Sequence, residues 1–142
     1  MAGSGDKPST PASGAAGMEL RAAHFPGRAP IDAYGNGGFR FAGMSHRGSL
    51  MCLPSGVYAW NAASFADLSL DAFARVLAEH ETIEVLLVGA GRDIALLKPE
   101  WRAAFRERSM SADAMTTGAA VRTFNVMLSE ERAVAAALIA VD

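Results

Sequence analysis

The feature that most constrains the fold is a change of hydrophobic period in the second half of the chain. The run from Ile83 to Val88 is rich in leucine and β-branched residues, lacks regular polar alternation, and ends at Gly89. This pattern is typical of a strand covered on both faces, which belongs in the middle of a sheet. Helical patterns flank the run on both sides. The order strand, helix, strand, helix, strand predicts a partly parallel central sheet with helices packed on it.

The helix before this strand is predicted to run from Ser69 to about His80. Its apolar residues recur at i, i+3, i+4 and i+7, which gives one apolar face. Ser69 can cap the first turn. On the polar face, Asp71, Arg75 and Glu79 have the i, i+4 spacing of a charge ladder. We therefore expect one continuous amphipathic helix here.

Four further elements are expected after Gly89. A second helix begins at Pro99, a residue suited to a first helical position, and runs to about Arg108. A weak strand pattern follows at Ser111 to Met115. The third helix has Thr116 or Thr117 as its N-cap, and a buried closing strand lies within Ala133 to Val141.

The first half is predicted to form a small meander of strands that starts near Ile31. Short apolar pieces around Phe39 to Phe41, Gly48 to Leu53 and Gly56 to Trp60 are separated by Gly, Pro and Ser. Asn36, Gly37 and Gly38 fit a tight turn that needs positive φ. Residues 1–18 have almost nothing to bury, and we expect a flexible tail there. The prediction is an α/β fold: one three-layer domain over residues 19–142, with a mixed central sheet flanked by helices and preceded by the meander.

Composition limits the classes of partner. The chain has 142 residues, a formal net charge of −2 and a pI near 5.9, so we expect no nucleic-acid surface. The longest uncharged run, Gly48 to Ala66, contains Pro54 and several polar residues, and it is a poor membrane span. The first residues lack the apolar stretch of a secretory signal. We expect a cytoplasmic protein, mitochondrial only if the source is eukaryotic.

Catalytic and metal chemistry find little support in the sequence. Cys52 lies in an apolar strand, where a free thiol is normally buried and inert. His46 lies in a turn-like stretch, where we expect an exposed histidine without a catalytic role. The three histidines are too far apart for a zinc motif. We assign no catalytic residue, metal or cofactor, and binding is favoured over catalysis.

Two glycines just after the central strand form the first candidate ligand site. Open α/β sheets usually leave a crevice at the carboxyl ends of their strands. The phosphate-binding fingerprint is incomplete, because Ile94 stands where its third glycine would be. A simple chain turn is the favoured interpretation, and anion binding by exposed amides is the alternative. The candidate residues are Gly89, Gly91, Arg92 and Asp93.

The start of the third helix is the second candidate. Small residues there leave amide N–H groups accessible near the positive end of the helix dipole, which suits a carboxylate or phosphate. The favoured interpretation is that small residues let the helix approach the sheet closely and that threonine caps the helix without a ligand. Pairing of Arg122 with a structural carboxylate such as Asp93 or Glu131 is likewise favoured over ligand binding. The candidates here are Thr116, Thr117, Arg122 and Asn125.

Several short motifs in a fixed order point to a known family. They are Tyr34-Gly35-Asn36-Gly37-Gly38-Phe39-Arg40, Gly48-Ser49, Trp60, Gly89-Ala90-Gly91, Met115-Thr116-Thr117, Arg122-Thr123-Phe124-Asn125 and Glu131-Arg132. From about Ile31 onward the chain resembles a family of domains of unknown function that includes a mitochondrial NADH dehydrogenase (complex I) assembly factor and an adipogenesis-associated human protein. Phe124 stands where the family pattern suggests tyrosine, and Glu131 where relatives often have glycine.

The resemblance implies a three-layer α/β domain with a mixed sheet, and it implies no established reaction. For the mitochondrial relatives it implies a role in assembling a membrane respiratory complex. Our leading hypothesis is a binding or assembly domain that docks on a protein partner. The alternative is a small anionic-ligand binder or weak enzyme that uses the cleft between the 89–93 loop and the helix start at 116–118. A homodimer is a third possibility.

Overall fold

The structure, a computed structural model, describes residues 25–142. The expected flexible tail, residues 1–18, and the start of the expected domain at residue 19 lie outside the described part. The eight strands are β1 Ile31–Gly35, β2 Gly38–Phe41, β3 Met44–Arg47, β4 Leu50–Leu53, β5 Gly56–Ala59, β6 Val85–Gly89, β7 Ser111–Met115 and β8 Val134–Leu138. The helices are α1 Ala74–Ala78, α2 Pro99–Glu107 and α3 Thr117–Ser129, with 3-10 turns η1 Phe65–Asp67, η2 Leu70–Phe73 and η3 His80–Thr82.

The strands form two sheets. The larger one has the order β5-β4-β8-β6-β7 and the smaller one the order β1-β2-β3. In the larger sheet β6 pairs in parallel with both β7 and β8, whereas β4 pairs antiparallel with β5 and β8. The predicted mixed central sheet is confirmed, with β6 in its interior. The last two strands of the expected meander, β4 and β5, belong to this central sheet.

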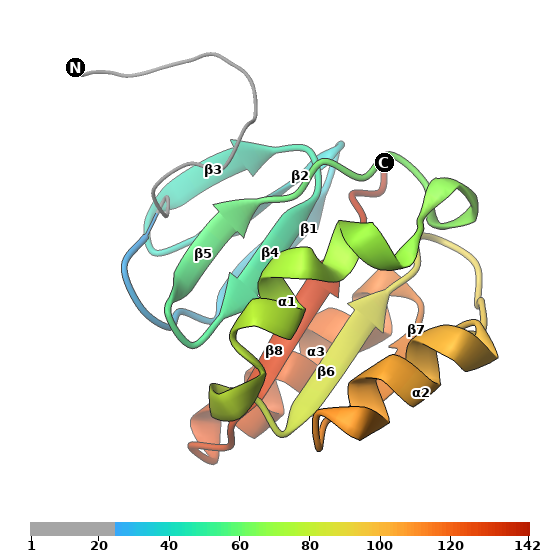
Figure 1. Cartoon of the computed structure of the whole chain (residues 1–142). Coiled ribbons are helices and arrows are strands. Elements are labelled where there is room, and N and C mark those ends of the chain that lie inside the picture. Colours follow the sequence, from blue (N-terminus) through green and yellow to red (C-terminus); the bar gives the residue numbers. More distant parts are fainter. Residues whose placement is uncertain (1–24) are drawn as a thin grey trace, which may run out of the picture.

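The central sheet separates two halves of the core (Figure 1). On one face α1 and α2 cover a cluster built around Phe73, whose ring lies 5.5 Å from Phe105 and 5.6 Å from both Trp60 and Trp101, between ring centroids. On the other face α3 and the small sheet bury a second cluster that includes Phe39. The result is the predicted three-layer α/β arrangement.

The first hairpin turns where the sequence predicts it. Asn36 and Gly37 have φ of 53° and 79° between β1 and β2. Both central residues of a type I′ turn need positive φ, which asparagine and glycine adopt at low cost. The turn brings the two strands into the register Tyr34↔Phe39.

The predicted helix from Ser69 to His80 is wrong as a single element. The segment forms η2, the five-residue α1 and η3 in succession. The Trp60 indole Nε1 donates to the Ala72 carbonyl at 2.9 Å, and this contact draws on an acceptor that a continuous helix would use for itself. The predicted cap is also wrong, because the Ser69 side chain makes no capping hydrogen bond.

The charge ladder predicted on that segment does not form. The Arg75 guanidinium lies 3.9 Å from the centroid of the Tyr58 ring, in a cation–π contact. Glu79 accepts a hydrogen bond from the Ser55 hydroxyl at 2.7 Å. Both side chains therefore turn toward β5 and the β4–β5 turn.

The end of α3 has the geometry of a Schellman motif. The Arg132 N–H donates to the Met127 carbonyl at 3.0 Å, and the Glu131 N–H donates to the Leu128 carbonyl at 2.9 Å. Glu131 adopts a left-handed conformation, with φ of 60°. This is the position where the resemblance described above suggests that relatives often have glycine.

We expect Glu131→Gly to raise the free energy of unfolding by about 1 kcal/mol, because the left-handed conformation strains any residue with a Cβ. Urea denaturation measures the change. The control is Glu130→Gly, at a residue with φ of −90°, where added backbone freedom should lower stability. A loss of stability in Glu131→Gly as large as in the control would contradict this account of the motif.

Candidate functional site

The two candidate segments meet at one edge of the central sheet. The three parallel strands β6, β7 and β8 end there, at Gly89, Met115 and Leu138. The glycine loop follows β6, and the start of α3 follows β7. This is the edge at which open α/β sheets leave a crevice.

Two reciprocal hydrogen bonds join these segments. The Gly91 N–H donates to Thr117 Oγ1 at 3.0 Å, and the Thr117 N–H donates to the Gly91 carbonyl at 2.9 Å. The Thr117 hydroxyl also donates to the Ile139 carbonyl at 2.7 Å. We call this junction of Gly89 to Gly91, Thr117 and Ile139 the glycine–threonine corner. Its polar groups are used within the fold.

Gly89 allows the close approach that the corner requires. A Cβ at Gly89 would lie 3.0 Å from the Cα of Thr117 and 3.0 Å from the Leu138 side chain. Its carbonyl accepts from the Ile139 N–H at 2.9 Å. Gly89 therefore allows β6 to pack closely against the start of α3. Gly91, with φ of 110°, allows the chain to turn.

The start of α3 keeps one of its first three amide donors without a hydrogen-bond partner among residues 25–142. The Thr117 N–H is bound by Gly91, and the Ala119 N–H by the hydroxyl of the N-cap Thr116 at 3.3 Å. Only the Gly118 N–H is left. A Cβ on Gly118 would overlap the Tyr34 hydroxyl and lie 3.5 Å from Arg122 Nη1. A phenol and a guanidinium thus flank the helix start.

The remaining candidates fall into two groups. Asn125 is bound at both ends of its amide: Oδ1 accepts from the Ile31 N–H at 2.9 Å, and Nδ2 donates to the Ile31 carbonyl at 2.8 Å. This clamp ties β1 to α3. Arg92, Asp93 and Arg122 are exposed.

The pairing of Arg122 with Asp93 or Glu131, weighed in the sequence analysis, is wrong. Within residues 25–142 the ion pairs join Arg102 to Asp113 at 3.4 Å and Arg132 to Glu130 at 3.9 Å. The Arg122 guanidinium is therefore available to a partner molecule.

Two exposed aliphatic side chains on the loop that follows the corner in sequence were not predicted. The loop from β6 to α2 exposes 77% of Ile94 and 78% of Leu96, while Leu97 between this loop and α2 is buried. Large aliphatic side chains this exposed mark contact surfaces when they cluster. The signal available in the sequence was the short apolar run from Ile94 to Leu97 between the charged residues Asp93 and Lys98.

Cys52 is buried and His46 is half-buried, and neither side chain is set up for catalysis in the way that its residue type would allow. Burial raises the pKa of the Cys52 thiol to about 12, so it stays protonated and inert at neutral pH. His46 is half-buried on β3, which corrects the expected exposed position. Its Nε2 donates to the Ser49 carbonyl at 3.0 Å, and burial lowers its pKa more than this bond raises it.

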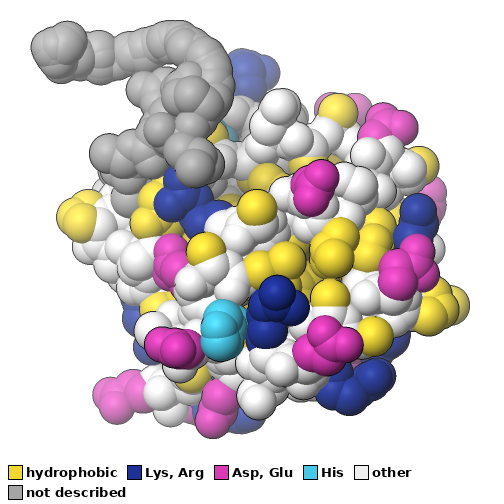
Figure 2. Space-filling model, viewed as in Figure 1, with side chains coloured by type: hydrophobic (Ala, Val, Ile, Leu, Met, Phe, Trp, Pro, Cys, Tyr) yellow, Lys and Arg dark blue, Asp and Glu magenta, His cyan; other side chains and the backbone are white. Residues whose placement is uncertain are grey.

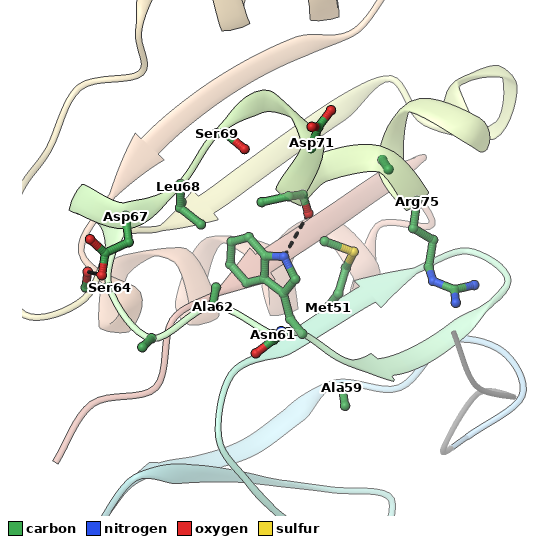
Figure 3. A pocket seen from close by; sticks show the side chains of 14 residues that line it. Met51, Ala59, Asn61, Ala62, Ser64, Asp67, Leu68, Ser69, Asp71 and Arg75 are labelled. Carbon is green, nitrogen blue, oxygen red and sulfur yellow. Dashed lines mark hydrogen bonds between the residues drawn. The ribbon is translucent and has the colours of Figure 1, made fainter. Parts of the chain in front are cut away.

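A hollow lies away from the corner, between the β5–η1 segment and α1 (Figure 3). Its volume is about 600 Å³. Trp60 is one of the residues that line it, and Asp67, Asp71 and Arg75 stand around it. None of the predicted site residues lines it.

The surface over α1 and α2 mixes both charge signs with apolar atoms (Figure 2). Among residues 25–142 no group of three or more His, Cys, Asp or Glu side chains could hold a metal ion. No helix in that same range is long and apolar enough to cross a membrane. The start of α3 at the corner and the exposed side chains of the loop that follows β6 are two features that could contact another molecule.

The fold and the corner define a small three-layer α/β domain whose motif residues mainly build the structure. The chain belongs to the family described as protein of unknown function (DUF498/DUF598), which matches residues 31–139. The resemblance drawn from the motifs is confirmed.

Two relatives and two solved structures place the chain within this family. It is 40% identical to an uncharacterized protein of Rhodobacter capsulatus, over 86% of this chain and 93% of that protein. It is 32% identical to NADH dehydrogenase (ubiquinone) 1 alpha subcomplex assembly factor 3 of Mus musculus, over 86% of this chain. The chain spans 66% of the length of that factor.

The solved structures have the same fold. One is described as an outer membrane protein from Bartonella henselae, with 57% identity, a TM-score of 0.81, and coverage of 84% of this chain and all of that one. The other is the Rpa2829 protein of Rhodopseudomonas palustris, with 44% identity, a TM-score of 0.75, and coverage of 87% and 91%.

Proposed function

We propose that this chain is an assembly-type domain that docks on a protein subunit of a membrane respiratory complex of the NADH dehydrogenase type, without catalysing a reaction. The observation that carries the proposal is the 32% identity to an NADH dehydrogenase assembly factor over most of the described domain. The internal use of the motif residues agrees with it, because Thr117 and Asn125 hold segments of the fold together.

The proposed docking surface comprises the loop that follows β6 and the start of α3, which follows β7 at the same edge of the sheet. Ile94 and Leu96 supply aliphatic anchors. Tyr34, 41% exposed, supplies an aromatic group, and Arg122, which forms no ion pair with any residue from 25 to 142, supplies a guanidinium group. Tyrosine and arginine are among the residues that dominate binding energy at protein interfaces. A subunit that lies across the corner would cover both groups.

Affinity capture tests this proposal. A tagged copy of the full chain, expressed in its native cell, should retain subunits of NADH dehydrogenase, identified by mass spectrometry. The double variant Ile94→Ser, Leu96→Ser should retain roughly tenfold less, because losing two apolar anchors costs about 1.4 kcal/mol or more. The matched control is Val126→Ser, at an aliphatic residue of α3 that is 56% exposed. Equal retention by all three proteins, or no respiratory subunit in any, would contradict the proposal.

A small anionic ligand at the helix start is the second candidate function. The observation in its favour is that the Gly118 N–H and the Arg122 guanidinium have no acceptor among residues 25–142. Millimolar phosphate or succinate should then raise the melting temperature, and Arg122→Ala should abolish the shift. If neither anion stabilises the wild type, this candidate is wrong.

Location and self-association belong to the same proposal. We place the chain in the cytoplasm, and recovery in an outer-membrane fraction, as the Bartonella relative's description would suggest, would contradict this placement.

Light scattering separates a partner-docking surface from a homodimer. A dimer that Ile94→Ser with Leu96→Ser dissociates would assign the loop to a second copy of the chain.

A further inference from the structure

One edge of the central sheet is open at β7. Among residues 25–142 this strand pairs only with β6, and it ends the sheet on that side. The Ser111 N–H donates to the Glu84 carbonyl, and the Met115 carbonyl accepts from the Ala90 N–H, so both residues face β6. Because main-chain groups alternate in direction along a strand, Ala112 and Ala114 present theirs to the open edge.

A single arginine from α2 crosses this edge. Arg102 Nη1 donates to the Ala112 carbonyl, and Nη2 lies against Asp113 Oδ1, both at 3.4 Å. These distances are beyond the usual range of about 2.7–3.2 Å, and 40% of the Arg102 side chain is exposed. Such long, solvent-exposed contacts contribute little to stability, and the Arg102 guanidinium can exchange them for contacts with another molecule.

A hollow of about 230 Å³ lies beside the arginine crossing, lined by Arg102, Arg106, Met110, Ser111 and Ala112. Arg106 follows Arg102 by one helical turn and forms no ion pair with any residue from 25 to 142. Two guanidinium groups beside a main-chain edge make the hollow attractive to a carboxylate, which the planar guanidinium can bind with two parallel hydrogen bonds.

From this juxtaposition we infer that the β7 edge binds an extended, acidic segment of a partner protein by strand addition. The main chain of the segment pairs with Ala112 and Ala114, whose small side chains leave the edge accessible. A carboxylate of the segment enters the hollow, contacts Arg106 and draws Arg102 from the Ala112 carbonyl. The inference does not rest on the proposed function, since the hollow adjoins the start of β7, at the opposite end of that strand from the glycine–threonine corner.

Titration of the full ¹⁵N-labelled chain with a peptide tests the inference. The probe is a blocked seven-residue peptide of alternating threonine and glutamate, and its control has lysine in place of each glutamate. We expect the glutamate peptide, at millimolar concentration, to shift the amide signals of Ala112 and Ala114, and the lysine peptide to leave them unchanged. Arg106→Gln should weaken binding about tenfold through loss of a charge-assisted bond. Arg108→Gln, the same charge change two residues further on, should preserve it.

Three results would overturn the inference. The first is the absence of shifts at Ala112 and Ala114 with the glutamate peptide. The second is an equal loss of binding in Arg106→Gln and Arg108→Gln, which would indicate general charge attraction. The third is an Arg102→Ala variant that self-associates in light scattering and binds no peptide, because Arg102 would then only guard the edge against pairing.

Discussion

Replacing Thr117 with valine is expected to lower the free energy of unfolding by about 3 kcal/mol, although the two side chains have nearly the same shape. The Thr117 side chain is fully buried, and its hydroxyl both accepts from Gly91 and donates to Ile139. Valine removes both bonds and leaves a buried N–H and a buried carbonyl without partners, each costing about 1–3 kcal/mol. Urea denaturation followed by circular dichroism measures the loss.

Thr117→Ser is the matched control for this prediction. Serine keeps the hydroxyl and removes only the methyl group, so we expect a loss of about 1 kcal/mol. If valine and serine cost the same, the stability of the corner comes from packing, and the two hydrogen bonds contribute little. If valine is harmless, the glycine loop and the helix start are not joined as described.

The substitution Gly38→Ala is expected to destabilise the small sheet by roughly 3 kcal/mol or more. Gly38 faces Arg47 across the β2–β3 pair, and a Cβ at Gly38 would overlap the His46 backbone carbonyl. A backbone carbonyl in a strand pair cannot rotate away as the end of a side chain can. The strands must therefore separate locally, which disturbs the core around Phe39.

The control is Gly118→Ala, whose new Cβ meets the flexible end of Tyr34. Alanine also favours the helical conformation more than glycine does, by about 1 kcal/mol. We expect this variant to be as stable as the wild type or slightly more stable, with Tyr34 displaced. Comparable losses in the two alanine variants would mean that Gly38 is not required for close approach.

The local sequence pattern predicted the helices and strands that are determined by neighbouring residues in the chain. The apolar run before Gly89 identified β6, Pro99 marked the start of α2, and Thr116 was one of the two residues expected to cap α3. The position of the glycine loop beside the helix start also followed from the rule that parallel strands end at one edge of a sheet.

Contacts between distant residues were not predictable in the same way. The Ala72 carbonyl, in the segment that forms η2, α1 and η3 in place of one helix, accepts from the Trp60 indole 12 residues away. The Asn125 side-chain amide forms two hydrogen bonds with the main chain of Ile31, 94 residues away. The sequence does not show this contact, so Asn125 could only be suggested as a ligand-binding residue. The exposure of Ile94 depends on how the loop leaves the core, which hydrophobic period alone does not encode.

The quantity of assembled NADH dehydrogenase is the most direct test of the assembly role. It is measured by native gel electrophoresis of membranes from cells that lack the gene for this chain. We expect the full complex to decrease and partly assembled forms to accumulate, with recovery by the wild type and not by the Ile94→Ser, Leu96→Ser variant. An unchanged amount of full complex in the deletion cells would contradict the account.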